Sequence, residues 1–181
     1  MTASGELGRR TVLRSGAAGL AGLAFAATAP SVARAAELTC TIELMQGHAV
    51  VIDHLLFAAL LPDPPAQKWI ITHAPGHDRN VFTIETADRR AGWVLPSAEP
   101  KEQIAVRPLI VGPSVPPFYP SNELWVITPA SGQNEGSYFI TSKVNDLGVG
   151  RAPIEDHSLN PKAVVTRPAN LPPYPVVIRK A

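Results

Sequence analysis

The chain has 181 residues, of which 45% are hydrophobic and 17% charged, and its 16 Lys and Arg nearly balance 15 Asp and Glu. A formal net charge of +1 carries no basic surplus of the kind that nucleic-acid-binding proteins show, so no nucleic-acid partner is predicted. The single cysteine, Cys40, cannot form an internal disulfide, which excludes a disulfide-stabilised scaffold.

The first 35 residues have the layout of a bacterial twin-arginine (Tat) signal peptide. Arg9 and Arg10 precede a weakly hydrophobic stretch over residues 16–32, and small residues follow at positions 33, 35 and 36. This layout predicts Tat export, cleavage after Ala35 and a protein that is secreted or periplasmic. The alternative is a membrane anchor, for which the stretch is short and rich in glycine.

Cleavage would leave residues 36–181 as a single domain of 181 − 35 = 146 residues, which is long enough for one hydrophobic core. The signal takes four arginines and one glutamate with it, so 16 − 4 = 12 basic and 15 − 1 = 14 acidic residues remain. No second hydrophobic span follows. We therefore expect a soluble monomer without a membrane partner, a cofactor or a metal.

The mature part of the sequence contains three similar units, at about 39–72, 81–128 and 137–179. Short strands rich in Val, Ile, Thr, Phe and Trp alternate with loops rich in Pro, Gly, Asn and Asp, and 18 of the 19 prolines lie beyond the signal. Each unit opens with a strand around an equivalent isoleucine, and these are Ile42, Ile84 and Ile140. Each closes, after a proline-rich loop, with a strand that contains Ile71, Ile127 or Ile178.

Three units of four strands predict an all-β domain of the β-trefoil class. The first and fourth strands of each unit would close a barrel, and the second and third would form hairpins that cap one end. Closure removes exposed sheet edges. The alternative, an immunoglobulin-like sandwich, does not explain the threefold repeat. The repeated Ile and Trp residues are interpreted as barrel core, as is the strand face shared by Cys40, Ile42 and Leu44.

The middle unit carries a family resemblance. Residues 82–88, 91–96 and 103–109, followed by 110–125, resemble the mushroom-type β-trefoil serine peptidase inhibitors, the cnispin and Lentinus proteinase inhibitor family. The resemblance implies a β-trefoil, a serine protease as partner and no enzymatic activity. The unit at 137–179 resembles the repeat that comes first in the family, which implies that the repeats here are circularly permuted.

The family's trypsin inhibitors present a basic residue on the loop that corresponds here to residues 112–122, and this loop has no Lys or Arg. Two aromatic residues stand there between prolines, which restrict the backbone and lower the cost of ordering a loop on binding. The predicted protease-contact residues are Pro116, Pro117, Phe118, Tyr119 and Pro120. Of the two aromatics Phe118 is the better candidate for the primary contact, because Tyr119 precedes a proline. An aromatic contact favours a chymotrypsin- or subtilisin-like protease over a trypsin-like one.

Other motifs support weaker alternatives. The Gln67–Lys68–Trp69 sequence matches the Q-x-W mark of trefoil lectins, so a glycan or a cell surface is the alternative partner. A solvated turn is favoured over a metal site for His73, His77 and Asp78. The neighbouring residues 156–158 (Asp, His, Ser) cannot line up as a catalytic triad.

Overall fold

Each of the three repeated units folds into four strands in a computed structural model, which describes residues 37–131, 136–152 and 158–181. Strands form where β-branched and aromatic residues cluster, and proline-rich segments separate them. The first unit contains β1 (Glu37–Leu44), β2 (Gly47–Ile52), β3 (Leu55–Ala59) and β4 (Trp69–His73). The second contains β5 (Val81–Thr86), β6 (Gly92–Val94), β7 (Ala105–Arg107), the 3₁₀ helix η1 (Ser121–Glu123) and β8 (Trp125–Pro129). The third contains β9 (Tyr138–Ser142), β10 (Val149–Arg151), β11 (Lys162–Thr166) and β12 (Val176–Lys180).

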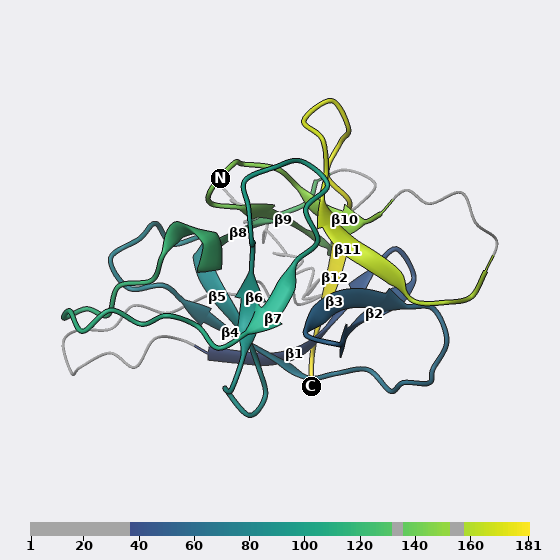
Figure 1. Cartoon of the computed structure of the whole chain (residues 1–181), viewed down its shortest axis with the longest axis horizontal. Helices are drawn as coiled ribbons and strands as arrows, with labels where there is room; N and C mark the ends of the chain where they lie inside the picture. Colours follow the sequence, from purple (N-terminus) through teal and green to yellow (C-terminus); the bar gives the residue numbers. More distant parts are fainter. Residues whose placement is uncertain (1–36, 132–135, 153–157) are drawn as a thin grey trace, which may run out of the picture. The chain divides into compact units, whose positions relative to one another are not determined.

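The first and fourth strands of the units close a six-stranded barrel (Figure 1). Within the units β1 pairs with β4, β5 with β8 and β9 with β12. Between the units β4 pairs with β5, β8 with β9 and β12 with β1. Every one of these six strands therefore has a neighbour on both sides, which protects its backbone groups from pairing with other chains.

The second and third strands form three hairpins that join at one end of the barrel. These are the pairs β2–β3, β6–β7 and β10–β11. Strand β3 also pairs with β7 and with β11, and the bridge between Gln103 and Val165 links the remaining two hairpins. A closed barrel capped by three hairpins with threefold arrangement is the β-trefoil, and the predicted fold class is confirmed.

The repeated isoleucines meet as cross-strand partners wherever one unit joins the next. The register pairs Ile71 with Ile84, Ile127 with Ile140 and Ile178 with Ile42. Ile84 and Ile140 are fully buried and Ile178 is half-buried. Packing β-branched side chains opposite one another stabilises paired strands. The isoleucines that repeat in the sequence therefore mark the three places where the last strand of one unit pairs with the first strand of the next, here called the inter-unit seams.

Three tryptophans occupy the core beside these seams. The Trp93 ring lies edge-on to both Trp69 and Trp125, with centroids 5.5 and 5.8 Å apart. The Trp69 indole N–H donates to the Ala49 carbonyl and the Trp125 indole N–H to the Trp93 carbonyl. Buried indoles usually find such a partner, whereas the buried Trp93 indole nitrogen has none among the described residues. The prediction that the repeated Trp residues belong to the core is confirmed.

The described residues include no helix long and apolar enough to cross a membrane. Residues 1–35, interpreted above as a Tat signal peptide, lie outside the described residues. Their export and their cleavage at Ala35 stay predictions.

Candidate functional site

The loop between β7 and β8 extends away from the barrel and returns to it through η1 (Figure 1). Its outer part is a short hairpin over residues 112–118, here called the apical hairpin. The Gly112 N–H donates to the Phe118 carbonyl at 2.8 Å, and Ser114 Oγ donates to the Pro116 carbonyl at 2.7 Å. A Cβ at Gly112 would lie 3.3 Å from the Phe118 Cβ, a tight contact, so the two arms approach each other closely at this glycine.

The hairpin and its base present apolar side chains to solvent. Phe118 is 58% exposed and Val115 completely so. Ile110 and Val111 at the base of the loop are exposed as well. Clustered exposed hydrophobic side chains mark interaction sites more often than scattered ones do. The hairpin therefore has the character of a contact surface.

The two aromatics singled out in the sequence have different roles. Phe118 faces solvent, whereas Tyr119 is half-buried and packs against the small cluster of Ala74, Val81 and Leu124. Burial raises the pKa of the Tyr119 hydroxyl above its usual value. Tyr119 therefore anchors the returning arm of the loop on the barrel and leaves Phe118 displayed.

A buried carboxylate fastens the base of the loop. Glu123 is only 2% exposed, and its two carboxylate oxygens accept from the Ile110 N–H at 2.9 and 3.0 Å. Burial raises the pKa of Glu123, while the bond from Ile110 and the charge of Arg107 act in the opposite direction. The two ends of the loop are thus joined through a side chain that was not singled out in the sequence. The signal that could have shown it is its position: Glu123 stands two residues before Trp125, as Gln67 does before Trp69.

The segment around η1 is also attached to neighbouring strands. The Leu95 N–H donates to the Asn122 carbonyl at 2.8 Å, and the Asn122 side-chain amide donates to the Leu95 carbonyl at 3.3 Å. The Lys143 N–H donates to the Leu124 carbonyl. Because the residues that directly follow β6 and β9 hold the base in this way, the hairpin projects from an ordered support.

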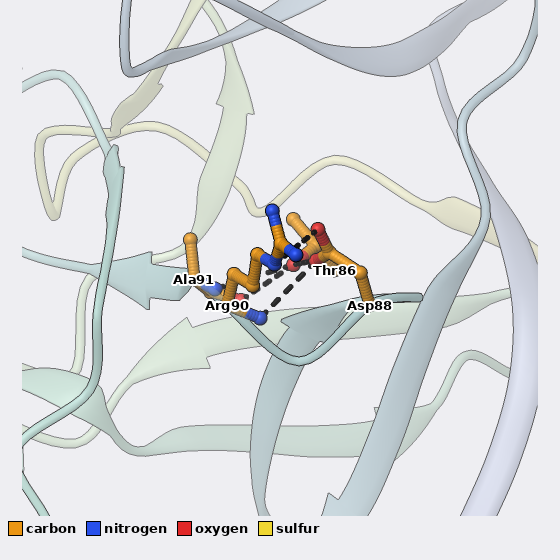
Figure 2. Close-up of polar contacts among 4 residues, drawn as sticks. All are labelled: Thr86, Asp88, Arg90 and Ala91. Atoms are coloured by element: carbon orange, nitrogen blue, oxygen red, sulfur yellow. Dashed lines mark hydrogen bonds and ion pairs between the residues drawn. The ribbon is translucent and has the colours of Figure 1, made fainter.

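The turn between β5 and β6 lies near the anchor of this loop. Figure 2 shows its polar contacts: Thr86 Oγ1 donates to Asp88 Oδ1 at 2.6 Å, and the Arg90 N–H donates to the same oxygen at 3.1 Å. Arg89, next to Arg90, forms an ion pair with Glu37 at 2.6 Å. The charge of Arg89 acts on the Tyr119 hydroxyl, opposing the effect of burial on its pKa. The turn is therefore ordered and places a cation beside the loop's anchor.

The proline loops of the other two units are fastened from the same position. Gln67 Oε1 accepts from the Val51 N–H at 3.0 Å, and the Tyr174 ring lies 3.6 Å from the Arg167 guanidinium. Gln67, Glu123 and Tyr174 each stand two residues before the fourth strand of their unit. The Gln of the Q-x-W motif is thus engaged by backbone, and Trp69 is buried in the core.

The remaining candidate residues do not assemble into a catalytic or metal site in the described part of the chain. The His73 ring contacts the Asp78 carbonyl through Nε2 at 3.1 Å. The described residues contain no group of three or more His, Cys, Asp and Glu side chains placed to hold a metal ion. Asp156 and His157 lie outside the described residues.

Comparison with known proteins identifies the family. The sequence profile of the peptidase inhibitor I66 family matches residues 26–129 and 133–180. The chain belongs to this family. Its members are inhibitors of peptidases and not enzymes, so the resemblance seen in the middle unit is confirmed.

Individual proteins are similar to about half of the chain. The chain is 44% identical over 79 residues to a serine protease inhibitor of Lentinula edodes, a match that covers 44% of this chain and 54% of the relative. It is 46% identical to a solved proteinase inhibitor from Coprinopsis cinerea, with a TM-score of 0.42, over 44% of this chain and 56% of that one. Each match spans about half the length of the relative.

The fold of this I66 member is shared more widely. The designed threefold-symmetric protein ThreeFoil is similar with a TM-score of 0.58 at 8% identity, over 79% of this chain and 99% of ThreeFoil. A likeness at such low identity concerns the fold alone. The circular permutation of the repeats stays a prediction.

Proposed function

We propose that this chain inhibits a serine protease through the apical hairpin, with Phe118 as the principal contact. The observation that carries the proposal is a large apolar side chain displayed on a hairpin whose two arms are held by hydrogen bonds. A hairpin that is ordered before binding loses little conformational entropy when it enters a cleft. Membership of a peptidase inhibitor family, and the likeness to a protein named as a serine protease inhibitor, support the same function.

The hairpin also accounts for resistance to cleavage. A serine protease hydrolyses a peptide only when the carbonyl oxygen of the contact residue enters the oxyanion hole. The Phe118 carbonyl already accepts from the Gly112 N–H inside the hairpin. Releasing it costs about 0.5–1.5 kcal/mol for the lost hydrogen bond, in addition to any opening of the hairpin. In this proposal the Phe118 ring fills an apolar pocket, and the bond from Gly112 disfavours entry of its carbonyl into the oxyanion hole by about tenfold at most.

The chemistry of the hairpin selects the class of enzyme. Residues 112–122 contain no Lys or Arg, so nothing in this loop could pair with the acidic primary pocket of a trypsin-like enzyme. An exposed phenylalanine fits an apolar pocket. The proposed partner is therefore a chymotrypsin- or subtilisin-like protease, and Pro116, Pro117 and Pro120 shape the approach to it.

The test is a panel of serine proteases titrated with the mature protein and its variants. Phe118→Ala should weaken inhibition of a chymotrypsin- or subtilisin-like enzyme at least about tenfold, as loss of a hot-spot side chain does. Phe118→Lys should shift inhibition toward trypsin. Leu61→Ala is the matched control, because Leu61 is also an exposed large hydrophobic residue, at 44%, but lies in the loop of the first unit.

Three results would contradict the assignment of the hairpin. They are strong inhibition of trypsin by the unmodified protein, inhibition unchanged by Phe118→Ala, and a larger loss in Leu61→Ala than in Phe118→Ala. Each would direct attention to the proline loops at 62–67 and 168–175. Failure to inhibit any serine protease would contradict the proposed function itself.

We further propose that the protein acts outside the cytoplasm after Tat export. The support is the paired Arg9 and Arg10, the weakly hydrophobic stretch after them and the small residues up to Ala35. In the producing cell, Arg9→Lys combined with Arg10→Lys should leave the uncleaved precursor in the cytoplasm. Immunoblotting of cell fractions measures this, and undiminished export of the double variant would refute it.

A further inference from the structure

We propose that Glu123 is the positioning residue of the apical hairpin: its buried carboxylate holds the Ile110 N–H and thereby fixes the direction in which the hairpin displays Phe118. This inference rests on the proposed inhibitory function. It adds a residue outside the contact surface and gives the buried carboxylate a role in ordering the loop.

The geometry singles Glu123 out. Both carboxylate oxygens accept from one backbone N–H, that of Ile110, on the outgoing arm of the loop. Glu123 itself belongs to η1, on the returning arm. The side chain therefore ties together two points that lie 13 residues apart along the chain and carry the whole hairpin between them.

Burial makes this contact costly to lose. A backbone N–H or a carboxylate that loses its partner inside a protein has no water to replace it. Glu123 is 2% exposed; burial raises the pKa of its carboxyl, and the bond from Ile110 and the charge of Arg107 oppose this rise. Without the carboxylate, the Ile110 N–H must find another acceptor, and the outgoing arm is free to move relative to η1.

Comparison of the three units supports the role of Glu123 in holding its own loop. The equivalent residue in the first unit, Gln67, accepts from Val51 N–H in β2, and that in the third, Tyr174, stacks on Arg167. The position is thus used in each unit to fasten the proline loop, with a different partner each time. In the first unit the partner lies in β2, whereas Ile110 and Arg167 both lie in the loop that follows the third strand of their unit, so in the second and third units the residue ties the two ends of the loop together.

The experiment combines hydrogen exchange with inhibition for four proteins: wild type, Glu123→Ala, Glu123→Gln and Gln67→Ala. Glu123→Ala should remove the protection of the Ile110 amide and weaken inhibition at least tenfold, chiefly through faster dissociation, and the loosened loop should be cleaved faster by the bound protease. Glu123→Gln keeps an acceptor oxygen and should retain both the protection and most of the inhibition. Gln67→Ala removes the equivalent side chain in the first unit and should change neither.

Several outcomes would overturn the inference. Protection of Ile110 that survives Glu123→Ala would show that the carboxylate does not hold the loop, and normal inhibition despite lost protection would show that holding it is irrelevant to binding. Equal losses in Gln67→Ala and Glu123→Ala would reveal a general loss of stability, and equal losses in Glu123→Gln and Glu123→Ala would exclude the acceptor role. If the wild type inhibits no serine protease, the proposed function fails, while the Ile110 exchange still decides whether Glu123 orders the hairpin.

Discussion

At the scale of single residues, chemical character depends on which side of the barrel wall a side chain faces. Cys40 shares the inner face of β1 with Ile42 and Leu44, and all three are almost completely buried. This confirms the predicted alternation. Burial raises the pKa of the Cys40 thiol to about 12, so the reactive thiolate is absent from the folded protein at neutral pH. The cysteine contributes to packing and not to chemistry.

This burial predicts a pH dependence of stability. Because the folded pKa is raised above the unfolded value of 9.0, folding keeps the proton that the unfolded chain loses. The contribution of Cys40 is full below pH 9 and is lost as the pH rises toward 12, with a slope of at most about 1.4 kcal/mol per pH unit. Urea titrations of wild type and Cys40→Ala between pH 7 and 11 measure it. A wild-type stability that fell no faster than that of the variant above pH 9, or rapid labelling of Cys40 by a thiol reagent in native buffer, would contradict this account.

At the scale of the elements, the residues that repeat in the sequence pair with one another at the inter-unit seams. Strand β5 places Ile84 opposite Ile71 of β4 inside the barrel, and its neighbour Phe82 is also buried. The proline loops contribute in another way. In each unit one of the side chains that fasten the loop stands two residues before the fourth strand, so this strand helps to determine where the loop returns.

Removing a seam side chain should therefore be costly. Ile84→Ala should lower the free energy of unfolding by about 2–5 kcal/mol, because it deletes buried methylene and methyl groups and leaves a cavity between two strands. Ile110→Ala is the matched control: its side chain is 67% exposed, and the change should cost less than about 0.5 kcal/mol. Chemical denaturation of the two variants compares them. A loss for Ile84→Ala no larger than that of the control would show that the seam does not carry the packing inferred for it.

At the scale of the whole molecule, the ring of strands has no unique starting point. Strand β12 pairs with β1 in the register Cys40 with Lys180, and the Ala181 N–H donates to the Thr39 carbonyl at 3.1 Å. The last strand of the described chain therefore ends beside the first one. This geometry is what a circular permutation requires, because it allows old ends to be joined and new ends to be opened without disturbing the ring.

A permuted protein should accordingly keep its fold. Joining residue 181 to residue 37 by a short glycine linker and opening the chain between Ala130 and Ser137 places the unit at 137–179 first, the order implied by the family resemblance. We expect the thermal unfolding midpoint to change by only a few degrees, and inhibition by less than about threefold, because the six barrel pairings are preserved. Calorimetry and protease titration measure the two. Loss of the cooperative transition would mean that the β12–β1 seam differs from the other two in its contribution.

Much of the fold follows from the sequence alone, and the reason is local. Strand periodicity, prolines between strands and an isoleucine repeated at each seam are properties of short segments, so they predicted twelve strands in three units and the buried positions of Ile84, Ile140 and Trp125. The family was also readable, because the middle unit carries a contiguous pattern from 82 to 125.

What only the tertiary structure decided depends on contacts between segments that no local pattern encodes. Phe118 and Tyr119 are adjacent and flanked by the same prolines, yet one is displayed and the other packs on Val81 and Leu124. The position of Glu123 two residues before Trp125 can be read from the sequence, but its burial and its bond to Ile110 exist only because the loop folds back on η1. The shape of a loop depends on where the barrel places its two ends. Closure of the barrel by pairing β12 with β1 brings the two ends of the chain together, so it is determined only when the whole chain has folded.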